Sequence, residues 1–171
     1  DVEYIESTGT QHIDTGVPLR EGLKMIVDWV YNDADSSNSY VGAHIGSPGQ
    51  RWLVGSQRQG DRYYFAVSGI NFPTEFKFGN RDIVEAYWKS NESYIKVNGV
   101  ESTLNNWRGY SYSNASIALD YTFYLGATNR DGNGTLKPKL KIYGCKFYQD
   151  DILVRNYIPC YNTIDGKIGL Y

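Results

Sequence analysis

The chain has 171 residues, of which 41% are hydrophobic and 21% charged, and its net charge at pH 7 is −2. This length predicts one domain with a sizeable core, and the balanced charge excludes the basic footprint of a protein that binds nucleic acid or an anionic membrane. No apolar run approaches the roughly 20 residues of a membrane-spanning helix.

The first half of the chain predicts short strands separated by Gly-, Pro- and Asn-containing turns. Residues 23–31 alternate most clearly, with Met25, Val27 and Trp29 on one face, so we expect Trp29 in the core. Residues 18–22 and 68–80 contain Pro and Gly and are expected to be loops. The strands expected in this half are residues 2–6, 11–14, 23–31, 39–45, 51–56, 62–67 and 82–89.

The second half continues the pattern with strands at 93–97, 121–127, 140–148, 152–161 and 168–171. Gln149-Asp150-Asp151 separates two runs rich in β-branched and aromatic residues, which indicates a hairpin. Pro159 cannot donate a ladder hydrogen bond, so the second run should leave the sheet there. Residues 104–116 and 128–138 are expected to be loops. About a dozen strands without helical periodicity predict an all-β sandwich or jelly roll that spans residues 1–171 as one domain.

The cysteines, Cys145 and Cys160, fall on the two arms of that hairpin. If the hairpin closes at residues 149–151, Cys145 pairs near Arg155 and Cys160 pairs near Leu140. The thiols would then be roughly 15 Å apart, at about 3.3 Å per residue. A disulfide needs Cα atoms within about 7 Å, so we expect two reduced thiols.

Both ends of the chain carry a family resemblance. Residues 2–16, VEYIESTGTQHIDTG, and residues 153–171, LVRNYIPCYNTIDGKIGLY, resemble the start and the end of a lectin-like jelly-roll domain of the laminin-G/concanavalin A type. Such domains recur in phage tail proteins and in bacterial surface proteins. The resemblance implies two antiparallel sheets, with ligands bound by loops at the rim or on the concave sheet. It also implies a fragment of a longer chain, because related domains continue past the final IGLY segment.

Catalysis is not expected. Glycoside hydrolases of this fold type carry a Glu-x-Asp-x-x-Glu pattern, which is absent from the sequence. Asp82 and Glu85 are three residues apart and point to opposite faces of a strand, whereas a retaining glycosidase needs two carboxyl groups about 5 Å apart. His12 and His44 have no neighbouring nucleophile motif or metal-ligand spacing. We expect both histidines to be partly exposed strand residues.

Residues 129–134, NRDGNG, form a candidate calcium loop. Asn129, Asp131 and Asn133 place oxygen side chains at positions 1, 3 and 5, with Gly at position 6, as in an EF-hand. Position 12 would be Leu140, which cannot ligate a metal, and flanking helices are not predicted. The alternative is a Gly- and Asn-rich connection between strands. Asp33 and Asp35 form a second, weaker candidate.

The loop at 105–114, NNWRGYSYSN, is the candidate ligand site. Its rings and short polar groups match sugar recognition, in which a C–H face packs on a ring while hydroxyls bond to polar side chains. The residues expected to contact the ligand are Asn105, Trp107, Arg108, Tyr110 and Tyr112. Arg51 and Trp52 could contribute from the sheet, as could Trp88 and either Tyr63 or Tyr64, because alternation places the last two on opposite faces. Trp107 could equally be a lid over the sandwich edge.

Together these features predict a non-catalytic carbohydrate-binding domain. The resemblance places it in a phage tail or baseplate receptor-binding protein that recognises a bacterial surface glycan, on a virion or outside the cell. A bacterial cell-surface or enzyme-accessory binding module is the alternative, and a structural or protein-binding domain is a further one. Single-site sugar affinity is weak, so we expect an oligomeric parent protein. No cofactor other than calcium is expected.

Overall fold

β-Strands form the framework of the computed structural model, which describes residues 2–32, 38–45, 50–57, 61–67, 70–89, 92–103 and 119–171. Its strands assemble into two large sheets and one small one. The described residues include no helix that is long and apolar enough to cross a bilayer.

The first large sheet, called sheet I, combines strands from the N-terminal, central and C-terminal parts of the chain. Its order is β1 (Ile5–Thr8), β14 (Lys139–Gln149), β3 (Leu23–Tyr31), β8 (Arg81–Trp88), β9 (Tyr94–Val97) and β10 (Val100–Glu101). The far end of β14 also pairs with β15 (Ile152–Tyr157). All of these pairings are antiparallel.

The second large sheet, called sheet II, is built mostly from the middle of the chain. Its order is β13 (Asn133–Thr135), β12 (Thr128–Arg130), β4 (Asn38–Ile45), β5 (Gln50–Gln57), β6 (Arg62–Val67) and β7 (Ile70–Lys77). β11 (Leu119–Leu125) joins β4 to β2 (Ile13–Leu19). The pairing of β12 with β4 is parallel, whereas the others in this sheet are antiparallel.

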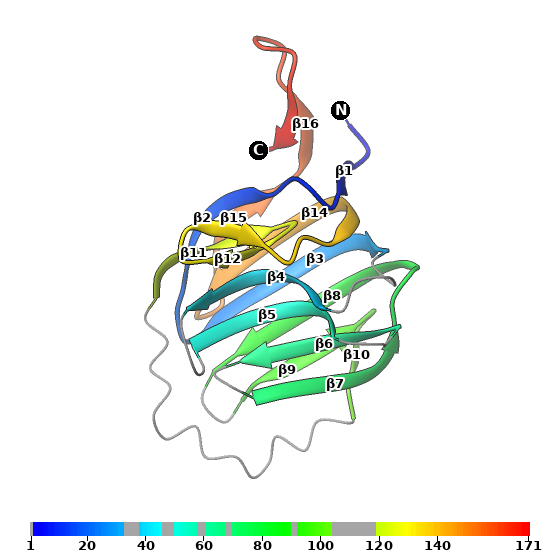
Figure 1. The fold of residues 1–171 in the computed structure, drawn as a ribbon, viewed down its shortest axis with the longest axis vertical. Helices are drawn as coiled ribbons and strands as arrows, with labels where there is room; N and C mark the ends of the chain where they lie inside the picture. Colours follow the sequence, from blue (N-terminus) through cyan, green and yellow to red (C-terminus); the bar gives the residue numbers. More distant parts are fainter. Residues whose placement is uncertain are drawn as a thin grey trace.

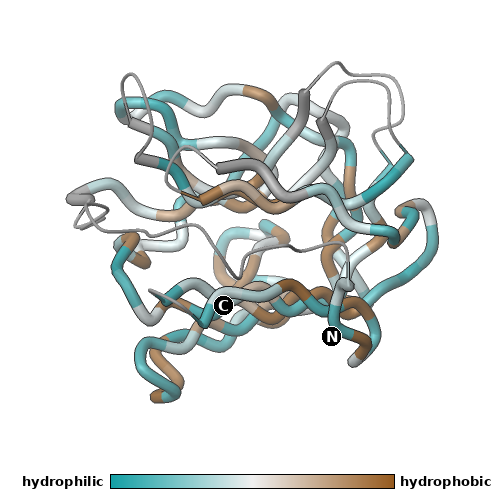
Figure 2. The backbone as a smooth tube through the Cα atoms, turned by 90° about the horizontal axis from the view of Figure 1, so that it is seen from below, coloured by the Kyte–Doolittle hydropathy of each residue, from teal (hydrophilic) through white to brown (hydrophobic). Residues whose placement is uncertain are grey.

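Sheets I and II pack face to face, as the two layers in Figures 1 and 2 show. In β3 every second residue from Leu23 to Tyr31 is fully buried, which is the alternation expected of a strand with one face on the core. The facing residues of sheet II include Trp52 and Phe65, and both belong to the same hydrophobic core. The prediction of an all-β, two-sheet jelly-roll sandwich is therefore confirmed, as is the core position of Trp29.

A buried hydrogen-bond chain links the two sheets across this core. The indole Nε1 of Trp29 donates to the hydroxyl oxygen of Tyr63 (3.1 Å), and that hydroxyl donates to Asp82 Oδ2 (3.1 Å). Asn98 Nδ2 donates to the other carboxylate oxygen of Asp82 (2.8 Å). Trp29 and Asp82 belong to sheet I and Tyr63 to sheet II. These hydrogen bonds therefore help to fix how the two sheets are aligned.

Three segments that were expected to contain loops include strands. Residues 128–138 contain β12 and β13. β7 runs through Pro73, and β2 runs through Gly16 and Pro18. Both strands lie at edges of sheet II, where a residue without an N–H can be accommodated because one side of the strand needs no ladder partner. The Pro and Gly signals were therefore wrong as loop predictions at these positions.

The hairpin between β14 and β15 closes through Asp150 and Asp151, whose φ angles are 48° and 64°. Positive φ at both central residues is the signature of the type I′ turn, whose twist matches that of the strands. A register shift after Phe147 pairs Cys145 with Tyr157, and not with Arg155 as expected.

The chain leaves sheet I at Ile158, and β16 (Pro159–Tyr161) pairs with β17 (Ile168–Leu170) in a separate hairpin. Figure 1 shows this hairpin projecting from one end of the sandwich, beside β1. Cys160 therefore pairs with Gly169, and not near Leu140 as expected. Cys145 is buried, Cys160 is half-buried, and both thiols are free.

Candidate ligand-binding surface on sheet II

The predicted aromatic loop lies outside the described residues. This applies to Asn105, Trp107, Arg108, Tyr110 and Tyr112, and also to the weaker acidic pair Asp33 and Asp35. The sheet residues that were expected to accompany the loop are described, and they separate into core and surface positions.

β5 places its two predicted site residues on opposite faces. The side chain of Trp52 is 1% exposed, and its ring meets Phe65 and Phe123 edge-on at centroid distances of 5.0 and 5.2 Å. A ring buried in this way cannot stack on a ligand from solvent, so the prediction that Trp52 contacts a ligand is wrong. Trp88 and Tyr63 are core residues for the same reason. Arg51 lies on the outer face and is half-buried.

Arg51 belongs to a row of polar side chains that crosses neighbouring strands. It lies opposite His44 of β4, which lies beside Arg130 of β12, which in turn lies opposite Asn133 of β13. Residues opposite one another in a sheet project from the same face, so these side chains share the outer surface of sheet II. Arg51, His44 and Arg130 are called the basic rung below.

The charges of the basic rung affect the pKa of His44. Partial burial and the guanidinium groups of Arg130 and Arg51 lower the pKa of this histidine, whereas Asp131 acts in the opposite direction. A lowered pKa means that His44 is held neutral more readily than a free histidine. The two arginines remain charged at all physiological pH values.

Aromatic and apolar side chains adjoin the basic rung on the same face. Tyr40, Leu53 and Ala66 form a small cluster that is at most 5% exposed, and the half-buried Tyr64 packs against it. Burial raises the pKa of both Tyr40 and Tyr64, and the nearby Arg51 opposes that effect at each phenol. The cluster therefore forms an apolar floor that is itself buried, and Tyr64 is the member whose ring is partly exposed.

Tyr40 and Tyr64 both lie opposite Gly55 of β5, which has no side chain to separate them. Tyr64 but not Tyr63 faces outward, as strand alternation predicted. The accessible groups of this face are therefore a tyrosine ring and guanidinium donors, both of which serve in sugar sites.

The candidate calcium loop is a tight hairpin between β12 and β13. Arg130 pairs with Asn133, and the two residues between them, Asp131 and Gly132, have φ angles of 52° and 83°. This is again a type I′ turn, in accordance with the alternative interpretation of the segment as a strand connection.

The first proposed calcium ligand is already engaged in this hairpin. Asn129 is 2% exposed; its side-chain oxygen accepts the N–H of Gly132 (2.9 Å), and its nitrogen donates to the carbonyl of Thr122 (2.8 Å). Asp131 and Asn133 are exposed. Within the described part of the chain, no three His, Cys, Asp or Glu side chains gather as a metal site would require.

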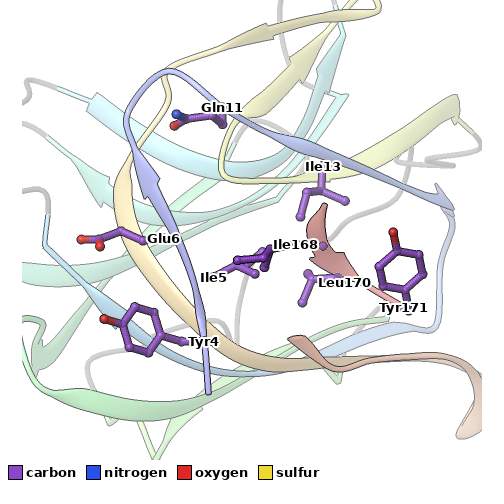
Figure 3. Close-up of a pocket in the computed structure, with 9 residues that line it drawn as sticks. Tyr4, Ile5, Glu6, Gln11, Ile13, Ile168, Leu170 and Tyr171 are labelled. Atoms are coloured by element: carbon purple, nitrogen blue, oxygen red, sulfur yellow. The ribbon is translucent and has the colours of Figure 1, made fainter. Parts of the chain in front are cut away.

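A separate groove of about 600 Å³ lies between β1 and β17. Figure 3 shows Ile5 of β1 beside Ile168 and Leu170 of β17, while Tyr171 closes one side. Its lining is mainly apolar, with Glu6 and Gln11 as its charged and amide side chains. None of the predicted site residues lines it.

The sequence analysis overlooked His44, Arg130 and Tyr40 as members of a site. The alternation of Tyr40, Gly42 and His44 along the expected strand 39–45 would have placed the first and last on one face. Arg130 carried no such signal, because it was assigned to a loop and its neighbour His44 is distant in the sequence.

Comparisons with known proteins support the fold. No family model matches the chain, and no curated protein matches its sequence. Among solved structures, the chain is similar to the K499G mutant of NanB sialidase from Streptococcus pneumoniae, with a TM-score of 0.57 and 15% sequence identity. The match covers 90% of this chain and 26% of that one. The chain therefore spans about a quarter of the length of that protein, and the likeness shows a shared β-sandwich fold.

Proposed function

We propose that this domain binds carbohydrate without transforming it and that the outer face of sheet II takes part in binding. The observation that carries this proposal is the placement of the basic rung beside Tyr64 and its apolar floor. A pyranose presents an apolar C–H face and a rim of hydroxyls, which require a ring and fixed hydrogen-bond donors respectively. The similarity to a domain-sized part of a sialidase is compatible with this role.

The arrangement of carboxylates favours a non-catalytic role. Asp82 is buried and bonds to Tyr63 and Asn98, whereas Glu85 accepts a hydrogen bond from Tyr94 on the outer face of sheet I. The two acids therefore work in separate networks on opposite faces of β8. A retaining glycosidase needs its two carboxyl groups on one surface.

The parent protein that we propose is an oligomeric receptor-binding component of a phage tail, with a bacterial surface polysaccharide as the ligand. This assignment depends on the resemblance of residues 2–16 and 153–171. A bacterial surface protein or an enzyme-accessory module would use the same binding chemistry. Calcium would have to act through Asp131 and Asn133, because Asn129 is committed to the turn.

A glycan array that includes bacterial wall polysaccharides tests the proposal, with the wild type compared with Tyr64→Ala. Loss of a stacking ring should weaken binding by roughly threefold to tenfold. Tyr148→Ala is the matched control, because Tyr148 is a half-buried tyrosine in β14 of sheet I and contacts Lys24. If only Tyr148→Ala weakened binding, the ligand would lie on the other face of the molecule.

The predicted aromatic loop is tested in the same assay by Trp107→Ala, with a melting curve to check folding. Loss of binding in a folded variant would place the loop in the site, whereas unchanged binding would assign recognition to sheet II alone. Runs with calcium and with a chelator complete the test of the cation.

The structural or protein-binding alternative is favoured by one observation, the apolar surface of the β16–β17 hairpin. Ile164 at its tip is 95% exposed, and Ile168 and Tyr171 are each more than half exposed beside the β1–β17 groove. Apolar side chains exposed together often mark protein contacts. A folded domain that bound no glycan, with or without calcium, would shift the assignment to this alternative.

A further inference from the structure

Surface cations on both sheets form ion pairs with carboxylates, including Lys77 with Asp61 beside sheet II. On sheet I, Lys24 bonds to Asp151 (2.6 Å), Arg81 bonds to Asp28 (2.8 Å), and Lys96 lies 4.0 Å from Glu101. On sheet II, the exposed guanidinium of Arg130 forms no salt bridge or hydrogen bond with the described residues. Among the described residues, Arg130 therefore lies beside another arginine and a histidine without an ion-pair partner of its own.

The geometry of the basic rung suits a single small anion. Neighbouring strands lie about 4.8 Å apart, so the backbones of Arg51 and Arg130 flank His44 at a separation of about 10 Å. Long side chains at that spacing can converge on one group of atoms between them. A guanidinium presents two parallel N–H donors that match the oxygens of a carboxylate, sulfate or phosphate.

We infer that the glycan bound by this domain carries an anionic substituent, a carboxylate, sulfate ester or phosphate, and that Arg130 and Arg51 hold this substituent at the basic rung. This inference rests on the proposed function, because it names the class of sugar that the same surface takes. A neutral sugar would leave the charge of Arg130 without a counterpart, whereas an anionic one adds charge-assisted hydrogen bonds.

The local field at His44 is consistent with an anion site. The charged groups that act on it are Arg130 of β12, Arg51 of β5 and Asp131 of the β12–β13 turn; partial burial and, to a smaller extent, the two arginines lower its pKa, whereas Asp131 raises it. A bound anion would counter the arginines, so the pKa of His44 should rise when the ligand is added. An NMR titration of the histidine ring, assigned with His44→Asn, measures this shift independently of affinity.

The experiment compares glycans that differ only in charge. A neutral oligosaccharide would be tested beside its uronic-acid, sulfated and phosphorylated forms at low and physiological salt, which distinguishes the three sources of the anion. We expect one charged form to bind at least roughly tenfold more tightly than the neutral form, since a hydrogen bond to a charged group is a strong one. Added salt should reduce this preference.

The variants assign the preference to the basic rung. Arg130→Gln should abolish most of the preference for the charged form, and Arg130→Lys should restore part of it. Arg155→Gln is the matched control, because Arg155 is an exposed arginine on β15 of sheet I and its removal changes the net charge equally. Circular dichroism would verify that each variant is folded.

Each outcome bears on a different claim. Equal binding of neutral and charged forms would overturn the anionic inference and leave carbohydrate binding standing. A preference that survives Arg130→Gln but not Arg155→Gln would place the anion away from the basic rung and overturn the assignment. Absence of binding to every sugar by the folded wild type would overturn the proposed function together with the inference.

Discussion

Replacing Tyr63 with Phe removes one hydroxyl from the centre of the sandwich. That hydroxyl accepts the indole N–H of Trp29 and donates to the carboxylate of Asp82, at 3.1 Å in each case. All three residues are at most 6% exposed, so water has little access to the atoms that would lose their partner. Burial and the neighbouring Asp82 also raise the pKa of Tyr63, which keeps its proton in place as a donor.

The cost follows from what the substitution leaves unsatisfied. A buried donor without an acceptor costs about 1–3 kcal/mol, and a hydrogen bond to a charged group contributes about 1.5–3 kcal/mol. Asp82 retains its bond from Asn98, which limits the second loss. We therefore expect Tyr63→Phe to lower the free energy of unfolding by about 2–4 kcal/mol, or roughly 4–16 °C in melting temperature for a domain of this size.

Urea denaturation followed by tryptophan fluorescence would measure this change, with calorimetry as a second probe. Tyr64→Phe is the matched control, because Tyr64 is the next residue along β6 and lies on the outer face. Its loss of a hydroxyl should cost less than about 0.5 kcal/mol. If Tyr63→Phe proved no more costly than Tyr64→Phe, the inter-sheet hydrogen-bond chain would not stabilise the fold as argued.

Three further predictions concern backbone geometry, thiol chemistry and acid stability. Gly42→Ala should cost about 3 kcal/mol or more in a urea melt, because an added Cβ would lie 2.0 Å from a main-chain oxygen of β5 at a φ of +131°; an unchanged midpoint would refute this. Burial raises the pKa of Cys145, so Ellman's reagent should label the half-buried Cys160 in the native protein and Cys145 only after unfolding; two fast thiols would contradict the assigned burial. Burial acts to raise the pKa of Glu75, but hydrogen bonds from the segment after β10 outweigh it and lower this pKa to about 2. The resulting stability is present above about pH 5 and is lost as pH falls toward 2, so Glu75→Gln should flatten the acid limb of the stability profile, and identical limbs would exclude this role.

The sequence was sufficient to predict the fold class, because alternation and turn chemistry are local properties. Residues 23–31 bury one face as their pattern indicated, with Trp29 in the core. Asp150 and Asp151 have positive φ angles at the predicted hairpin turn. Pro159 marks the point at which the chain leaves sheet I.

Edge positions were the weakest part of the prediction. Pro73 and Pro18 were interpreted as loop signals, but both lie in strands at edges of sheet II. A proline is incompatible with a central strand but can be accommodated in an edge strand. Whether a strand is central or at an edge depends on the neighbours that it acquires in the folded protein. The bulge after Phe147, which moves the partner of Cys145 by one residue, is likewise a product of pairing.

The candidate site divides in the same way. The sequence placed Arg51 among the candidate residues and predicted that Tyr63 and Tyr64 face opposite sides, because side-chain alternation needs no knowledge of neighbouring strands. It could not separate the buried Trp52 from a surface ring, because either face of β5 might have been the outer one. The basic rung exists because β12 lies parallel to β4 and brings Arg130 beside His44 from a distant part of the chain. Strand alternation is therefore determined by the sequence alone, whereas the register that joins distant strands, and with it the charge of the surface, is decided by the packing of the whole sandwich.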